Sequence, residues 1–139
     1  MPDCIFCKII AGEIPSTKIY EDEKVLAFLD INPINPGHTL VIPKTHSEDL
    51  LTASEDDLVA VIKAVKKIAP AVVRGVGAQG FNLGVNNGEA AGQIVNHLHF
   101  HIMPRFEGDG FKLWGGRQYK EGEIDEYAER IKKFLISNF

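Results

Sequence analysis

The stretch that most constrains the fold is 97–103, which reads His-Leu-His-Phe-His-Ile-Met. Histidine and apolar residues alternate with a period of two, which predicts a strand with one face in a core and the three histidines on the other. Neighbouring histidines would lie about 6.6 Å apart along the strand. Three of the five histidines of the chain fall here, and this density favours a metal site, a catalytic site or both over a structural role. The histidines are His97, His99 and His101, and the core residues are Leu98, Phe100 and Ile102.

The rest of the chain predicts an α+β fold with a mainly antiparallel sheet. One long helix is expected to begin at an N-cap, either Ser54 or the capping box 52–55, and its apolar stripe ends at Val72. Pro70 falls inside this helix and predicts a kink or an early end. Strands are expected at 18–21, 25–30, 38–43, 81–85 and 97–103, the last ending at Pro104, and a C-terminal helix at 124–135.

Residues 75–80 match the pattern G-x-G-x-x-G of dinucleotide-binding proteins. That fingerprint requires a strand before the glycines and a helix after them. Here the predicted helix comes first and the strand follows, so the order is reversed. We interpret these glycines as a helix C-cap and a turn.

Composition narrows the class of protein. A chain of 139 residues fits one domain, and a net charge of −4 without a block of Lys or Arg argues against non-specific binding to nucleic acids or membranes. No apolar run reaches 18 residues, and the first residues do not resemble a secretory signal. We therefore expect a cytoplasmic protein, in which two cysteines are thiols or metal ligands and not a structural disulfide.

The histidines allow two metal sites. All three could bind one ion, which would use every titratable group of the strand. Alternatively, the pair Cys4 and Cys7, spaced C-x-x-C, could place two thiolates on a tetrahedral zinc that His46 and His97 complete. From the spacing alone, two half-buried thiols without a metal remain an equal alternative.

The same histidines suit chemistry at phosphorus. A neutral histidine is a nucleophile when its other ring nitrogen donates to a fixed acceptor, and neighbouring imidazoles can bind the charged oxygens of the transition state. The loop 86–93 before the strand adds backbone N–H groups and the amides of Asn86 and Gln93. This combination favours a phosphate ester, amide or anhydride as substrate.

At this point the sequence resembles the histidine-triad (HIT) family, in its Hint-like branch. The resemblance covers residues 4–110, nearly the whole chain. It implies a HIT-like fold with a five-stranded sheet, in a single domain over 1–139 whose segment 107–139 is a flexible glycine-rich loop and a helix. It also implies a homodimer formed through the helix 54–72 and the strand 80–85. The matching segments are His97–Met103, Ile5–Ile10, Glu13–Pro15, Phe28–Ile31, Pro36–Lys44, Asn82–Gly84, Asn87–Gly88 and Gly92–Gln93.

The resemblance implies a hydrolase that works through a nucleotidyl-histidine. His99 would attack the α-phosphorus of a purine nucleotide phosphoramidate, assisted by His101 and His38, and water would release a nucleoside monophosphate. Asp30 would accept hydrogen bonds from the ribose hydroxyls. The other nucleotide contacts would be Ile5, Phe28 and Ile31 around the base, and Asn86, Gln93 and Ile94 near the phosphate. The alternatives are a dinucleoside polyphosphate hydrolase, a nucleotide-binding regulatory module, and a metal-dependent hydrolase that uses the histidines as ligands.

The cofactor implied by the resemblance is a structural zinc, with no organic cofactor. Its ligands would be Cys4, Cys7, His46 and His97. The sequence departs from the family pattern at Ile94, which stands where many Hint-like proteins have a serine near the phosphate, and this departure bears on the leaving group. Pro104-Arg105-Phe106 also replaces the Gly-Gly-Arg-Gln run that often follows the triad, and the loop 107–118 is longer and richer in glycine. Trp114, in that loop, would either reach a partner subunit's site or cover its own core.

Overall fold

The computed structural model describes residues 3–137, and the chain divides into two compact units between Asp109 and Gly110. The division falls close to residue 107, where the sequence places the start of the C-terminal segment. The first unit contains every strand and two α-helices, and the second contains α3 (Glu123–Ser137). Within residues 3–137, no helix is long and apolar enough to cross a bilayer.

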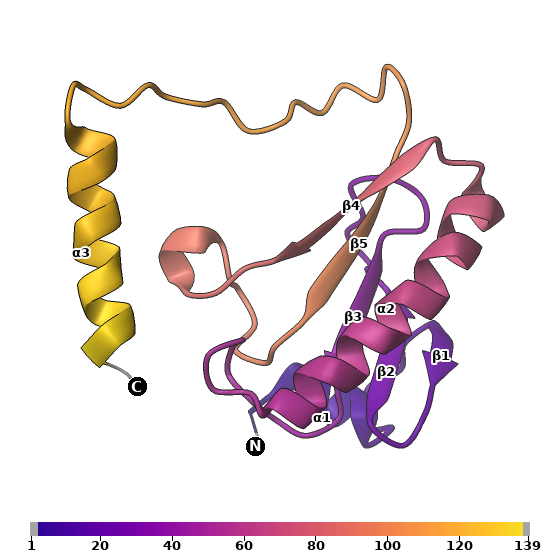
Figure 1. Cartoon of the computed structure of the whole chain (residues 1–139). Coiled ribbons are helices and arrows are strands. Elements are labelled where there is room, and N and C mark those ends of the chain that lie inside the picture. The colour runs from indigo at the N-terminus through magenta and orange to yellow at the C-terminus, as the bar shows by residue number, and fades with distance from the viewer. Residues whose placement is uncertain (1–2, 138–139) are drawn as a thin grey trace. The chain divides into compact units, whose positions relative to one another are not determined.

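The first unit is built on a five-stranded antiparallel sheet with the strand order β1-β2-β3-β5-β4 (Figure 1). This arrangement confirms the predicted α+β fold. Two hairpin-like pairs, β1 with β2 and β4 with β5, flank the central strand β3, which places β4 at one edge of the sheet and β5 beside it. The strands are β1 (Lys18–Glu21), β2 (Val25–Leu29), β3 (Thr39–Pro43), β4 (Gly80–Val85) and β5 (Phe100–Arg105).

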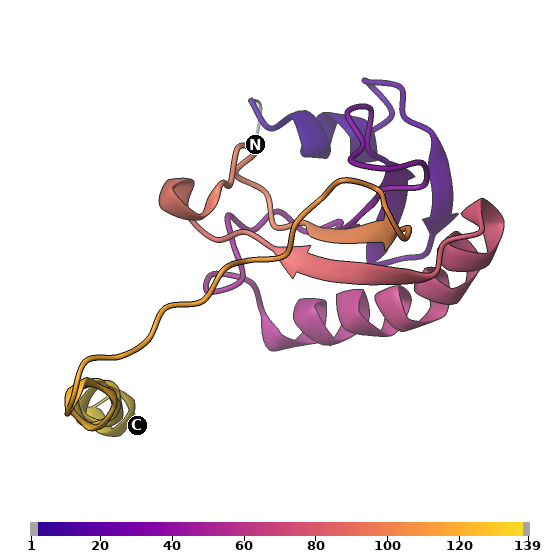
Figure 2. The same ribbon diagram turned by 90° about the horizontal axis from the view of Figure 1, so that it is seen from above.

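Helices cover both faces of this sheet (Figure 2). The long helix α2 (Glu55–Val76) lies on one face and the short helix α1 (Ile5–Ile10) on the other. Alternate residues of the strands enter two separate apolar clusters: Val41 belongs to the cluster under α2, and Ile42 to the cluster under α1. The first cluster also contains Leu98, Phe100 and Ile102, as the alternating pattern predicts. The histidines therefore face the layer that contains α1.

The ends of α2 follow from its sequence. The side chain of Ser54 accepts a hydrogen bond from the N–H of Asp57 at 3.1 Å, which satisfies one of the free donors of the first turn. The helix ends at Gly77, whose positive φ of 70° suits glycine and whose N–H is directed at the carbonyls of Val73 and Arg74. The interpretation of residues 75–80 as a C-cap and turn is confirmed.

The prediction of an early helix end at Pro70 is wrong. The helix continues through Pro70 to Val76. Pro70 and Lys66, whose carbonyl loses its i+4 donor, both lie on the exposed side of the helix, where water can satisfy that carbonyl. Buried Ile68 and Val72 hold the helix on the sheet on either side of the proline.

The predicted bounds of the histidine strand are also wrong at both ends. The regular strand β5 begins at Phe100, so His97 and His99 precede it, and it continues through Pro104 to Arg105. Pairing of β5 with β3 stops at Ile102, so at Pro104 the strand has a partner only in β4. A proline, which lacks an N–H, is tolerated where one side of the strand is unpaired.

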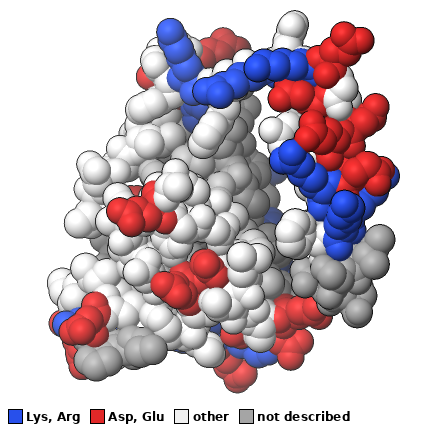
Figure 3. Space-filling model, turned by 90° about the vertical axis from the view of Figure 1, so that its left-hand side faces the viewer, with Lys and Arg blue, Asp and Glu red and all other residues white. Residues whose placement is uncertain are grey.

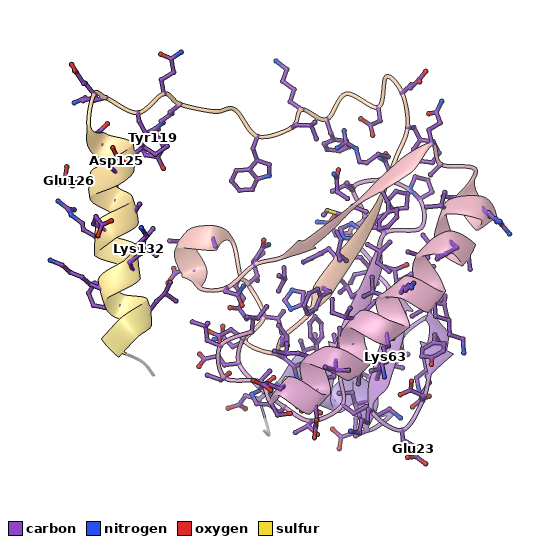
Figure 4. The ribbon with its side chains drawn as sticks, viewed as in Figure 1. Glu23, Lys63, Tyr119, Asp125, Glu126 and Lys132 are labelled. Carbon is purple, nitrogen blue, oxygen red and sulfur yellow. The ribbon has the colours of Figure 1, made fainter. Side chains whose placement is uncertain are left out.

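The second unit consists of an extended segment and α3. Its apolar side chains are largely exposed, among them Trp114 at 97%. Glu126 and Lys132 project from α3 (Figure 4), and Glu126 forms an ion pair with Arg130. Acidic and basic side chains lie side by side on the face shown in Figure 3, much of which is uncharged.

Candidate active site and metal cluster

A cavity of about 450 Å³ lies between α1 and the sheet. Apolar side chains of α1 and of the end of β2 form much of its wall, and its lining also includes several polar side chains. Most of the sequence-predicted nucleotide contacts line it, whereas His38 and Gln93 do not. The contacts that line it are Ile5, Phe28, Asp30, Ile31, Asn86, Ile94, His99 and His101.

His99 is held as a neutral imidazole with a known proton position. Its Nδ1 lies 2.7 Å from the carbonyl oxygen of His97, and because a carbonyl only accepts, Nδ1 carries the proton. Nε2 therefore keeps its lone pair. Burial lowers the pKa of His99, against the smaller opposing effects of the His97 carbonyl and of Asp30. The ring edge of Phe6 packs against His99 at a centroid distance of 5.1 Å. His99 is therefore a buried, oriented imidazole whose Nε2 carries a free lone pair, the arrangement that a nucleophile requires.

A chain of hydrogen bonds fixes the other two imidazoles. The backbone N–H of Ile34 donates to Nδ1 of His38 at 3.1 Å, which places the His38 proton on Nε2. Nε2 of His38 lies 2.9 Å from Nδ1 of His101 and donates to it, so His101 carries its own proton on Nε2. The Nε2 atom of His101 is buried and has no partner among the described residues. Burial, followed by the neighbouring His99 and His38, lowers the pKa of His101 to about 4. The chain thus ends in an N–H group beside the cavity without a protein acceptor.

Asp30 and Asn86 are the remaining polar groups at this end of the cavity. Asp30 directly follows β2, and its carboxylate accepts from the N–H of Asn32 at 2.8 Å and lies 3.7 Å from Nε2 of His38. Asn86 directly follows β4 and makes no hydrogen bond with any described residue. We call Asp30, His38, His99 and His101 the reaction cluster.

Gln93 does not line this cavity, and its side-chain amide is hydrogen-bonded within the loop. Its side-chain NH₂ donates to the carbonyls of Glu48 and Val95 at 2.7 and 3.0 Å, and its Oε1 accepts from the N–H of Gly88 at 2.9 Å. Its backbone N–H donates to the carbonyl of Gly88. These bonds hold the loop between β4 and β5, so Gln93 supports the loop that carries Ile94.

The second group of titratable residues, which we call the metal cluster, comprises Cys4, Cys7, His46 and His97, with one ligand atom of each within 4.8 Å of the others. Sγ of Cys4 lies 3.4 Å from Nδ1 of His97, and Sγ of Cys7 lies 3.3 Å from Nδ1 of His46. The two Nδ1 atoms are 3.2 Å apart. A tetrahedral zinc with ordinary bond lengths separates a sulfur from a nitrogen by about 3.6 Å and two nitrogens by about 3.3 Å. The donor set and its spacing therefore fit zinc.

The surroundings of His97 also suit a ligand. Its Nε2 donates to the carbonyl of Pro43 at 2.8 Å, which leaves the lone pair on Nδ1 facing the two sulfurs. Burial lowers the pKa of His97 and raises that of Cys7, and the thiol of Cys4 raises the latter further. Without a cation, ionisation of both Cys4 and Cys7 is therefore unfavourable. A bound cation would stabilise both thiolates.

Asp30, His38 and His101 form another group whose ligand atoms lie within 4.8 Å. Here the hydrogen bonds oppose a metal ion. The lone pair on Nδ1 of His38 is occupied by the Ile34 N–H, so the nitrogen that faces the group carries a proton. A metal ion bound to Nε2 of His38 would require the ring proton to be on Nδ1. The Nδ1–H of His38 and the N–H of Ile34 would then be two donors facing each other without an acceptor. This geometry disfavours a metal ion held by Asp30, His38 and His101.

Sequence reasoning missed three contributors to the reaction cluster. The Ile34 N–H and the His97 carbonyl assign the protons of three histidines, and as backbone groups they leave no signal in residue identity. Phe6, which packs against His99, is part of a short apolar segment whose sequence alone does not distinguish a core residue from a site residue.

Comparisons with known proteins identify the family of the chain. Residues 11–108 match the family model described as the HIT domain. An uncharacterised HIT-like protein of Methanocaldococcus jannaschii is 54% identical over 129 residues, which cover 93% of this chain and 98% of that protein. The adenylylsulfatase HINT3 of Arabidopsis thaliana is 49% identical over 93% of this chain and 66% of its own length. The adenosine 5′-monophosphoramidase hnt1 of Schizosaccharomyces pombe is 44% identical over 73% of this chain and 74% of its own.

Solved structures share the fold. A crystal structure of a protein from Streptococcus mutans superposes with a TM-score of 0.92 at 44% identity and covers 97% of this chain and 87% of that one. A zinc-bound histidine triad family protein from Mycobacterium smegmatis superposes with a TM-score of 0.75 at 39% identity, over 99% of both chains. Since the family model matches most of the first unit and these relatives align along most of their length, the chain belongs to the HIT domain family.

Proposed function

We propose that the protein hydrolyses purine nucleotide phosphoramidates through a covalent nucleotidyl-His99 and releases a nucleoside monophosphate. The observation that carries the proposal is the proton position of His99, whose Nδ1–H bond to the His97 carbonyl leaves the Nε2 lone pair for attack at the cavity. A phosphoramidase and an adenylylsulfatase among the relatives support a reaction that splits a bond to a nucleotide phosphorus.

The reaction has two steps. Nε2 of His99 attacks the α-phosphorus, the P–N bond breaks, and the amine leaves with a proton from solvent. Water then attacks the same phosphorus, the P–His99 bond breaks, and the nucleoside monophosphate is released. The Nε2–H group of His101, buried and without a protein partner, donates to a phosphoryl oxygen whose charge grows in both transition states. His38 acts through His101, because its own Nε2 proton is directed at that ring.

Other residues of the cavity position the nucleotide. Asp30 accepts hydrogen bonds from the ribose hydroxyls, and the free amide of Asn86 binds the phosphate or the atom that leaves. Ile5, Phe28 and Ile31 enclose the base, and exposed Ile94 borders the leaving group. Gln93 contributes indirectly by holding the loop.

We further propose that the metal cluster binds one structural zinc. Four protein ligands fill a tetrahedral zinc, so the ion has no open position for substrate. When bound, the ion supplies a cross-link between the N-terminal segment, the His46 loop and His97. Since the carbonyl of His97 orients His99, this cross-link steadies the acceptor of the nucleophile. The zinc-bound mycobacterial relative supports the assignment. We propose no organic cofactor.

A homodimer is proposed through β4 and α2. β4 lies at an edge of the sheet and exposes Phe81 and Leu83, each at 43%, and α2 exposes Val59 and Ile62 on its outer side. Light scattering after gel filtration tests this proposal: a mass of two chains supports it, and a single chain at micromolar concentration contradicts it.

The function is tested by offering adenosine 5′-phosphoramidate, diadenosine tetraphosphate and adenylyl sulfate to wild type and to His99→Ala. We expect the phosphoramidate to be hydrolysed fastest, with an acid-labile nucleotidyl adduct on wild type alone. Faster hydrolysis of diadenosine tetraphosphate would favour the runner-up activity, with the same nucleophile and another leaving group. Equal turnover by wild type and His99→Ala would refute the mechanism.

A further inference from the structure

The cavity has a polar group to which the proposed reaction assigns no role. Ser16 lines the cavity, and its hydroxyl oxygen is buried without a hydrogen-bond partner among the described residues. Buried hydroxyls are nearly always paired, and an unpaired one carries a free-energy cost. A serine oxygen can be redirected by rotation about its Cα–Cβ bond without movement of the backbone. Ser16 is therefore able to gain a partner when a ligand fills the cavity.

The sheet places Ser16 away from the histidines. The carbonyl of Thr17 accepts from the N–H of Leu29 at 3.0 Å, which extends the pairing beyond β1 and sets Ser16 beside the end of β2, where Asp30 follows. The strand order β1-β2-β3-β5 puts three strand spacings, about 14 Å, between this edge and the strand that carries His101. Asp30, which directly follows β2, lies between them.

This order matches the order of groups in a nucleotide. With the phosphorus at His99 and the ribose at Asp30, the base extends towards Ser16. The wall around this end is apolar, with Ile14, Pro15 and Leu29 beside Ser16. Asn32 is the other uncharged polar side chain at this end, but it is exposed and remains hydrated. The Ser16 hydroxyl is thus the buried polar group nearest to the expected position of the base.

We propose that the Ser16 hydroxyl is a specificity-determining contact that hydrogen-bonds the edge of the nucleobase. The proposal rests on the proposed function, because it assumes a nucleotide with its phosphorus at His99. A serine hydroxyl donates and accepts, so it can serve a ring nitrogen or an exocyclic amine. With this contact, an otherwise apolar pocket would bind a nucleotide more tightly than a ligand that lacks the base or that carries an apolar group in its place.

The experiment compares binding of AMP and of ribose 5-phosphate, which lacks the base, by NMR titration. Ser16→Ala should weaken AMP about threefold to tenfold, the range expected for one neutral hydrogen bond, and leave ribose 5-phosphate unchanged. Thr17→Ala is the matched control: its side chain is exposed and outside the cavity, and it should bind both ligands as wild type does. Ser16→Ala should also raise the melting temperature of the free protein slightly, because it removes an unpaired buried oxygen.

The outcomes separate this inference from the proposed function. Wild type that hydrolyses phosphoramidate while Ser16→Ala binds AMP with unchanged affinity contradicts the Ser16 contact alone. An equal loss for AMP and ribose 5-phosphate also contradicts it, since the effect would not involve the base. Wild type that neither binds AMP nor turns over a nucleotide contradicts the proposed function, and the Ser16 contact with it.

Discussion

The metal cluster and the reaction cluster both use histidines, and the segment 97–101 contributes to each: His97 belongs to the metal cluster, and His99 and His101 belong to the reaction cluster. In the metal cluster, the Pro43 carbonyl accepts a hydrogen bond from Nε2–H of His97. The lone pair of His97 is therefore on Nδ1, which faces two sulfurs. In the reaction cluster, the Ile34 N–H donates to the lone pair on Nδ1 of His38. The proton of His38 is therefore on Nε2, which faces His101. The difference teaches that the backbone group behind each ring, an acceptor or a donor, decides whether an imidazole offers a lone pair or a proton.

Removal of the nucleophile should have the largest effect. We expect His99→Ala to lower kcat by a factor of roughly 10⁴ or more, because the covalent step is lost while the binding groups remain. Single-turnover hydrolysis of adenosine 5′-phosphoramidate measures it. The zinc content of the variant should match that of wild type, since no ligand of the metal cluster changes. Retention of more than about a tenth of the activity would assign the attack to another group.

Removal of the metal cluster's thiols should affect stability more than chemistry. The double variant Cys4→Ser/Cys7→Ser should lose its zinc and melt about 10 °C lower or more, because the cross-link between three segments is lost and His97 is left buried beside two hydroxyls. Calorimetry and elemental analysis measure both quantities. An unchanged melting temperature with no zinc in wild type would show that the cluster is a pair of thiols without a metal.

The carboxylate of Asp30 should affect binding and not the covalent step. We expect Asp30→Asn to raise KM for an adenosine substrate about tenfold or more, because an amide cannot accept both ribose hydroxyls as a carboxylate does. A 2′,3′-dideoxy substrate lacks these hydroxyls and should be bound equally by variant and wild type. If Asp30→Asn raised KM equally for both substrates, Asp30 would act through His38, whose Nε2 lies 3.7 Å from its carboxylate.

A smaller effect is expected from pH. Because burial holds the pKa of His101 at about 4, below its ordinary value of 6.5, the fold favours the neutral ring. Its contribution to stability is complete above pH 6.5 and is lost as pH falls from 6.5 towards 4. His101→Gln, which cannot be protonated, should therefore show a flatter decline of melting temperature over this window. Parallel curves for the two proteins would place the His101 pKa near its solution value.

Side-chain pattern was enough to predict much of the fold. The alternation of His and apolar residues places Leu98, Phe100 and Ile102 in one core, and the glycines of residues 75–80 predict a C-cap and turn, which the structure places at Gly77. These features depend on periodicity and on the conformational freedom of glycine, which are local properties. Pro70 and Pro104 were mispredicted because their tolerance depends on exposure and on unpaired strand sides, which are tertiary properties.

For the site, the sequence could predict which residues gather but not how their protons are arranged. Cys4, Cys7, His46 and His97 do lie together, as their side-chain types suggest. The Ile34 N–H, the Pro43 carbonyl and the His97 carbonyl are present in any sequence, so only the folded backbone assigns them. The same applies to Gln93, whose amide meets the Glu48 and Val95 carbonyls through the path of a loop.

The most direct test of this division is a long-range ¹H–¹⁵N NMR spectrum of the histidine rings of the zinc-loaded protein near pH 7. The account predicts protons on Nε2 of His38, on Nδ1 of His99 and on Nε2 of His97 and His101, with a metal-bound shift for Nδ1 of His97. A proton on Nδ1 of His38, or on Nε2 of His99, would contradict it, because the first would free His38 for a metal and the second would remove the nucleophilic lone pair.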